Sequence, residues 1–176
     1  MRKLPAEVVA SALAATTIFT PSHLPPWAIF IAWAGTFAAG GPKPEVLKKI
    51  WTTMPIGTVF AFLIVMGFKF AGQHLQGAAL IAAQCAILFT LNGTMMLLGR
   101  LPLFSFVPGM FFGFASYFGT LFGNFGPMPG DPLIALAATM LMNALGPIFA
   151  WLTAHFGAHH HAEPTEPLPS AKEAVR

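Results

Sequence analysis

The stretch SFVPGMFFGFASYFGTLFGN, residues 105–124, places a row of small residues among large aromatic ones. Because a helix turns once every 3.6 residues, residues three or four apart share a face. That spacing puts the small residues on one broad helical face and most of the phenylalanines on the others. The face consists of Gly109, Gly113, Ser116, Gly119 and Gly123.

Such a segment is a poor helix in water, where each interior glycine costs about 1 kcal/mol relative to alanine. In a bilayer the backbone must hydrogen-bond to itself, so the helix forms in spite of its glycines. A smooth face of small residues then lets a second helix approach closely. We therefore predict helix packing at these four glycines, and more weakly at Gly35, whose neighbours Ala28, Ala32 and Ala39 complete a second small face. The alternative is that the exposed backbone lines a narrow passage.

Composition supports a lipid environment. Of the 176 residues, 56% are hydrophobic and only 9% are charged, whereas soluble domains carry roughly a quarter charged residues. Several intervals without any charge exceed the ~20 residues needed to cross a bilayer. They lie between Glu7 and Lys43, Lys69 and Arg100, Arg100 and Asp131, and Asp131 and Glu163.

The pattern predicts an all-α polytopic membrane protein with six transmembrane helices. The expected spans are about 4–20, 27–41, 47–70, 76–98, 104–123 and 133–156, separated by segments rich in proline and glycine. One six-span domain, 1–157, is followed by a tail, 158–176, that is expected to be disordered. The basic, apolar N-terminus also resembles a signal peptide, but a retained helix is favoured because the repeat described below needs it.

Lysine and arginine predict the orientation. With both termini cytoplasmic, the cytoplasmic segments hold eight of these residues and the opposite side holds only Lys69. This bias follows the positive-inside rule and predicts an inner (cytoplasmic) membrane protein of a bacterium. The eight are Arg2, Lys3, Lys43, Lys48, Lys49, Arg100, Lys172 and Arg176.

Two pairs of spans resemble each other. The second and fifth align at an offset of 84, which superposes Gly35 on Gly119, and the third and sixth align at an offset of 86, which superposes Thr53 on Thr139. Three spans per half would insert the second half upside down. The sequence therefore predicts a 3+3 inverted repeat, an arrangement that places a site near the membrane midplane in transporters. A duplication kept only for packing is the alternative.

The polar residues expected at membrane depth are neutral. Those considered to line a solute path are Gln84, Asn92, Ser116, Tyr117 and Asn143. Amide and hydroxyl groups replace water around a neutral solute, although hydrogen bonding between helices also explains them. The absence of mid-span ionisable groups argues against proton coupling.

No catalytic motif is present, so we expect no enzymatic activity, cofactor, metal centre or nucleic-acid partner. The histidine run His159–His161 lies in the tail, where solvation is expected more often than metal binding.

The stretches WAIFIAWAGTFAAGG, residues 27–41, and SFVPGMFFGFASYFG, residues 105–119, resemble the bacterial inner-membrane family called domain of unknown function 1097. The resemblance covers about residues 10–155, and the FVPG element is its most specific part. It implies a small polytopic membrane protein and supplies no substrate or site residue.

We therefore predict a channel or facilitator for a small neutral or weakly ionised solute. The alternative is an accessory subunit whose glycine-rich face packs against a partner membrane protein or a second copy.

Overall fold

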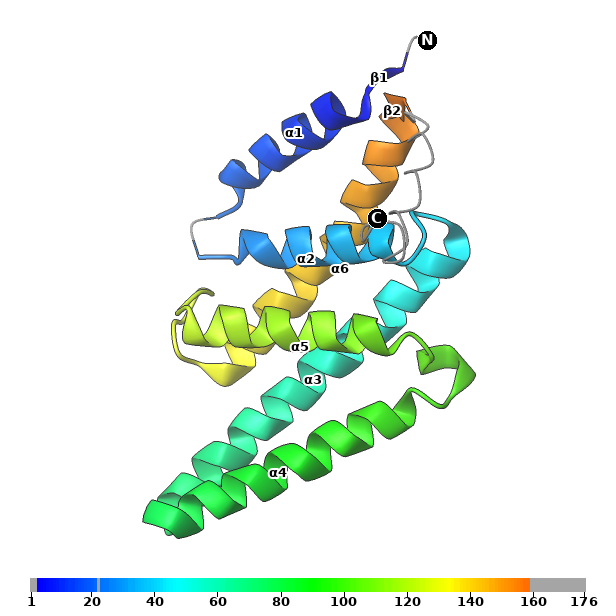
Figure 1. Cartoon of the computed structure of the whole chain (residues 1–176). Coiled ribbons are helices and arrows are strands. Elements are labelled where there is room, and N and C mark those ends of the chain that lie inside the picture. The colour runs from blue at the N-terminus through cyan, green and yellow to red at the C-terminus, as the bar shows by residue number, and fades with distance from the viewer. Residues whose placement is uncertain (1–2, 22, 159–176) are drawn as a thin grey trace, which may run out of the picture.

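The computed structural model describes residues 3–21 and 23–158 and is helical almost throughout (Figure 1). The all-α prediction is confirmed. The elements, in order, are β1 (Leu4–Pro5), α1 (Ala6–Thr16), η1 (Thr17–Phe19), α2 (Pro26–Ala38), α3 (Pro44–His74), α4 (Gly77–Leu98), η2 (Pro102–Phe104), α5 (Val107–Phe122), α6 (Pro132–Phe156) and β2 (Gly157–Ala158).

Proline and aspartate define several helix starts. Pro26, Pro44, Pro108 and Pro132 lie in the first turns of α2, α3, α5 and α6, where a missing N–H costs nothing. Asp131 caps α6, because its side chain accepts hydrogen bonds from the backbone N–H groups of Leu133 and Ile134 at 2.8 and 2.9 Å. The prolines that the sequence analysis placed between spans therefore begin the helices.

Three helices are long and apolar enough to cross a membrane, namely α3, α4 and α6. The helices α1, α2 and α5 are apolar but have only 11, 13 and 16 residues. At 1.5 Å per residue, α2 covers about 20 Å, less than the ~30 Å hydrocarbon core. The predicted spans 4–20 and 104–123 extend beyond these helices into the 3-10 turns η1 and η2, and the span 27–41 extends into the turn at Gly40 and Gly41.

Successive helices run back and forth across the molecule (Figure 1). The most extensive packing is between α3 and α5 and between α2 and α6. The helix α1 packs on α6 at one edge, and α4 packs on α3 at the other. The two-residue strands β1 and β2 pair in parallel and join the start of α1 to the end of α6. Beyond Ala158 the predicted tail lies outside the described residues.

Glycine sets the distance between α3 and α5. A Cβ atom on Gly57 would overlap the Met110 carbonyl oxygen, and one on Gly113 would overlap the Met54 carbonyl oxygen. The backbones of the two helices are therefore in direct contact. The pair α2 and α6 is built similarly, since a Cβ atom on Gly146 would lie only 2.6 Å from the Trp33 backbone nitrogen.

The predicted glycine face divides between two neighbours. Gly109 and Gly113 are buried against α3, while Gly119 meets the indole of Trp27, 3.3 Å from where its Cβ would lie. Gly35 lies under the ring of Phe112.

The prediction for Gly123 needs correction. It is the exposed C-cap of α5, and its backbone N–H bonds to the carbonyls of Gly119 and Leu121. It therefore ends the helix and takes no part in packing between helices. The sequence pattern continued past the point where the helix stops.

The Gly57→Ala and Gly113→Ala variants should each lower the thermal unfolding midpoint of the purified protein. A methyl group there must push two backbones apart, and overpacking typically costs about 1–3 kcal/mol. Gly93→Ala is the control, because Gly93 lies in α4 with no neighbouring atom within 4 Å of an added Cβ. That change should be neutral or stabilising. Equal midpoints for Gly113→Ala and Gly93→Ala would contradict the direct backbone contact.

Candidate functional site

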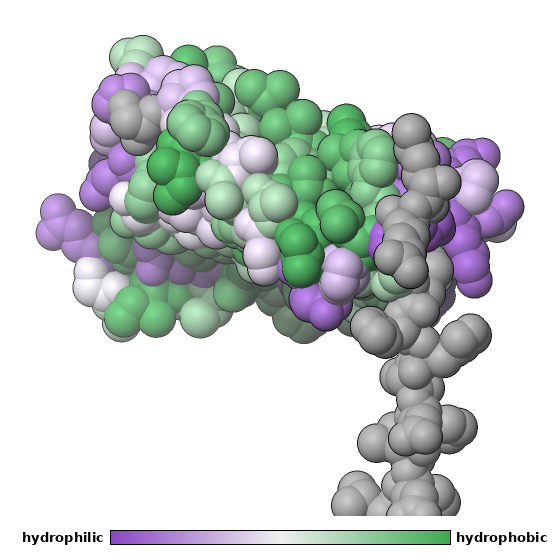
Figure 2. All heavy atoms as spheres, turned by 90° about the horizontal axis from the view of Figure 1, so that it is seen from above, coloured by the Kyte–Doolittle hydropathy of each residue, from purple (hydrophilic) through white to green (hydrophobic). Residues whose placement is uncertain are grey.

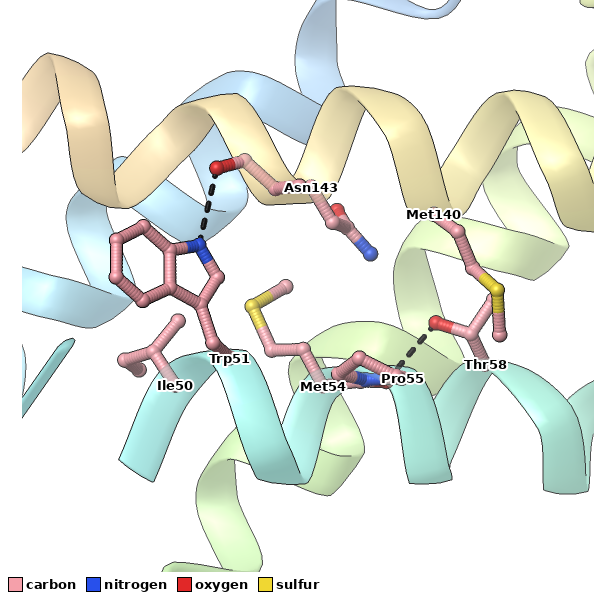
Figure 3. A pocket seen from close by; sticks show the side chains of 8 residues that line it. Ile50, Trp51, Met54, Pro55, Thr58, Met140 and Asn143 are labelled. Carbon is pink, nitrogen blue, oxygen red and sulfur yellow. Dashed lines mark hydrogen bonds between the residues drawn. The ribbon is translucent and has the colours of Figure 1, made fainter. Parts of the chain in front are cut away.

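A cavity of about 100 Å³ lies between α3 and α6. Figure 3 shows its lining side chains projecting from the two helices into a common space. The lining carries no charged group and is mostly apolar. It consists of Ile50, Trp51, Met54, Pro55 and Thr58 from α3 and Met140, Asn143 and Ala144 from α6.

Asn143 is the distinctive residue of this cavity. Its side chain is only 4% exposed, and neither amide atom has a hydrogen-bond partner within the part of the chain that the structure describes. The amide points into the space between α6 and α3 (Figure 3). A buried polar group without a partner costs about 1–3 kcal/mol. The fold therefore carries at this position an amide that does not stabilise it.

Two prolines interrupt the backbone hydrogen bonding of the helices beside the cavity. Pro55 lies inside α3 and Pro147 inside α6. A proline has no N–H for the carbonyl four residues earlier. The carbonyls deprived of a helical donor are those of Trp51 and Asn143, both of which line the cavity. Both helices nevertheless run without a break past these prolines.

The other polar groups of the lining are occupied. The Trp51 indole N–H donates to the Ala144 carbonyl at 3.1 Å and so ties α3 to α6. The Thr58 hydroxyl donates to the Met54 carbonyl at 2.9 Å and lies 3.2 Å from the Gly113 carbonyl. Figure 3 draws the first two of these bonds on either side of the open space. Among the lining side chains described, Asn143 alone keeps free hydrogen-bonding atoms.

The structure separates the residues predicted to line a solute path. Asn143 alone lies at the cavity. Ser116 and Tyr117 are buried on α5, where the Ser116 hydroxyl has no partner in the described segments and Tyr117 donates to the Pro132 carbonyl at 3.2 Å. Gln84 and Asn92 lie half-buried on α4, the helix at the edge of the bundle. The five residues therefore do not form one continuous polar path.

A larger cavity of about 510 Å³ lies further along α3, beside the end of α5. Its lining includes Lys69 and Asn124 among apolar side chains. Between the two cavities, α3, α5 and α6 close over a core of Ala61, Val65, Tyr117, Leu121 and Ala135. The Asn143 cavity is therefore sealed from this end by a hydrophobic cluster.

Trp51, Met54, Thr58 and Met140 line this cavity but were not predicted from the sequence to line a site. A signal was nevertheless present. Proline and glycine interrupt two otherwise apolar helices as PIG at 55–57 and as GP at 146–147. Such proline and glycine residues inside apolar helices mark places where backbone groups lack a helical partner.

Metal binding finds no support in residues 3–21 and 23–158, where no cluster of three His, Cys, Asp or Glu side chains is present. The histidine run His159–His161 lies outside these residues.

The Asn143→Leu variant should raise the thermal unfolding midpoint or leave it unchanged. Leucine removes two unpartnered polar atoms and extends into the adjacent cavity, for a gain on the order of 1 kcal/mol. Thr58→Val is the comparison, because it removes a partnered hydroxyl and should lower stability by about 1 kcal/mol. If Asn143→Leu proves as destabilising as Thr58→Val, the amide must have a bonding partner in the folded protein.

Comparison with known proteins gives one result. The family model for proteins of unknown function named DUF1097 matches residues 7–158. No curated protein and no solved structure matches the chain. The matched region includes all six helices and ends at β2, so it extends slightly beyond the resemblance seen in the sequence. The chain belongs to the DUF1097 family.

Proposed function

We propose that this protein is an inner-membrane facilitator or transporter for a small neutral or weakly ionised solute, which binds at the Asn143 cavity. One observation carries the proposal, namely a 96% buried amide whose two polar atoms face a cavity and bond to nothing in the described chain. A folded protein gains nothing in stability from such a group. A solute that bonds to the amide gives it a function.

The packing supports the 3+3 inverted repeat as part of this proposal. If α2 corresponds to α5 and α3 to α6, then the contact of α3 with α5 corresponds to that of α6 with α2. These are the two most extensive helix contacts in the molecule. Four buried residues of α2 fall on buried residues of α5 at the offset of 84: Ile29 on Gly113, Ala32 on Ser116, Trp33 on Tyr117 and Thr36 on Thr120.

For α3 and α6, burial favours an offset of 89 over the 86 obtained from sequence. The shift of three residues is about one helical turn. At 89, each buried residue of α3 from Val46 to Ile64 falls on a buried residue of α6. The pairs are Val46–Ala135, Ile50–Thr139, Thr53–Met142, Met54–Asn143, Gly57–Gly146, Thr58–Pro147, Ala61–Ala150 and Ile64–Thr153.

This register bears directly on the site. Trp51, Met54 and Pro55 become the counterparts of Met140, Asn143 and Ala144, which are all the lining residues that α6 contributes. The cavity would therefore lie on the axis that relates the two halves. Transporters with inverted repeats bind their substrates at this position.

The hydrophobic cluster next to the cavity favours a facilitator that changes conformation over a permanently open pore. The hydrophobic cluster at Tyr117 and Leu121 closes the way toward the cavity at Lys69. On the opposite side, the Trp51–Ala144 hydrogen bond holds α3 against α6 beside the Asn143 side chain. Passage would require the two helices to separate at one place and then at the other.

The alternative, an accessory subunit that docks through its glycine-rich face, has less support than the transport proposal. In the folded chain α3 covers Gly109 and Gly113, and Trp27 of α2 covers Gly119. A partner would find no free small-residue face on α5.

Charge distribution supports six spans with both ends cytoplasmic. Because the helices alternate in direction, Lys43, Lys48, Lys49 and Arg100 gather at one end of the molecule, and Lys69 lies toward the other. Figure 2 shows apolar side chains across the middle of one face and hydrophilic side chains mainly toward its two ends. A band of this kind suits a bilayer crossed by all six helices, with the short ones lengthened by their flanking turns.

The orientation can be tested with single cysteines in a Cys85→Ala background. Gln73→Cys and Ser105→Cys are exposed and lie at opposite ends of the bundle. In intact spheroplasts, a membrane-impermeant maleimide should label the first and should label the second only after the membrane is opened. The reverse pattern would mean that the orientation is inverted. Labelling of both cysteines in intact spheroplasts would place both on the same side of the membrane and so contradict a single crossing by α4.

Transport can be tested in proteoliposomes by osmotic swelling with urea, acetamide, glycerol and small acids. At least one solute should enter faster than into empty liposomes, and Asn143→Leu should slow that entry about tenfold or more through loss of the bonding group. Gln73→Leu, an exposed polar-to-leucine change at the end of α3, should keep the original rate. Entry no faster than into empty liposomes for every solute would refute the proposed function.

A further inference from the structure

We infer that the Asn143 cavity selects a small neutral molecule with a primary amide or urea-type edge, on which a hydrogen-bond donor lies next to an acceptor. This inference names the substrate class of the proposed transport function and rests on that function for its biological meaning. The binding step itself can be measured separately.

The Asn143 side chain carries two polar atoms without a hydrogen-bond partner in the described chain. The Asn143 side chain offers Oδ1 as an acceptor and Nδ2–H as a donor, side by side in one plane. Both lack partners in the described chain and both face the cavity. A ligand amide satisfies both at once, because its own N–H and C=O form two parallel hydrogen bonds in a closed ring. A protonated carboxylic acid carries the same paired edge, but carboxylic acids have pKa values of about 4 and are ionised at neutral pH. Among simple solutes that are neutral at that pH, the paired edge is typical of primary amides and ureas.

Other ligand classes fit less well. A ketone satisfies only Nδ2, and an amine satisfies only Oδ1, so either one leaves a buried atom without a partner. A carboxylate would lose its hydration among lining residues that carry no charge. A hydroxyl donates and accepts through a single oxygen, so its two hydrogen bonds to neighbouring atoms of the site are bent and weaker than the two straight bonds of an amide edge.

The size and the remaining walls limit the ligand further. A cavity of about 100 Å³ holds roughly three water molecules by liquid volume, which suits a molecule the size of urea or acetamide. Ile50 and the thioether of Met54 project from the facing helix α3, and the thioether of Met140 lies on α6, one turn from Asn143 (Figure 3). Flexible methionine side chains adapt to small differences in ligand shape. An amide with a short apolar end therefore fits both the polar and the apolar wall.

Four probes of equal heavy-atom count separate these classes: acetamide, acetone, 2-propanol and acetate. Binding to the full-length protein in lipid nanodiscs can be measured by ligand-observed NMR, and entry can be measured in proteoliposomes. Acetamide should bind at least about tenfold more tightly than the other three. Asn143→Leu should reduce acetamide binding to the level of acetone and so abolish the preference for acetamide.

Asn143→Ser is a second variant that keeps a polar group but removes the paired edge, and it should also lose the preference for acetamide. Equal binding of all four probes, or an unchanged preference in both variants, would overturn the inference. Preferential entry of a probe other than acetamide would overturn it while leaving the proposed transport function intact. Conversely, acetamide binding that depends on Asn143, without entry above empty liposomes, would support the inferred site and refute transport.

Discussion

Direct contact between helix backbones is the constraint on which the rest of this structure depends. Gly57 and Gly113 bring α3 and α5 together without intervening side chains, and Gly146 does the same for α6 against α2. In lipid there is no hydrophobic gain from bringing helices together, so close packing must supply the attraction. The same glycines hold Pro55 and Pro147 at the centre of the bundle, where the broken helical hydrogen bonds are shielded from lipid.

The polar side chains around the cavity differ in whether they form hydrogen bonds. Around Asn143 the Trp51 indole donates to the Ala144 carbonyl of α6, and the buried Thr58 hydroxyl lies 3.2 Å from the Gly113 carbonyl of α5, so both strengthen contacts between helices. The amide itself bonds to nothing in the described residues and so weakens the fold. Functional sites are where such local inconsistencies are expected. The difference between Asn143 and its neighbours is therefore more informative than the size of the cavity.

Sequence reasoning predicted the helices well and the site only in part. Long charge-free runs and prolines located α3, α4 and α6 to within a few residues, because lipid permits only a continuous helix there. Asn143 was among the predicted path residues for a sound reason, its polarity at membrane depth. Gln84 and Asn92 satisfied the same rule but lie on α4, because periodicity does not reveal which helix occupies the centre. Sequence alone also leaves the register of the proposed repeat open by one helical turn, since apolar sequences align almost equally well at neighbouring turns.

The backbone contacts also define which parts of the molecule can move. A helix pair joined through glycine has no side chains between its members to rearrange, so α3 with α5 forms one stiff arm and α2 with α6 forms another. Each arm takes one helix from each half of the chain, so the halves are interlocked. The Asn143 cavity lies along the seam between the arms, bridged on one side by the Trp51–Ala144 hydrogen bond. A motion of one arm relative to the other would therefore change the shape of this cavity first.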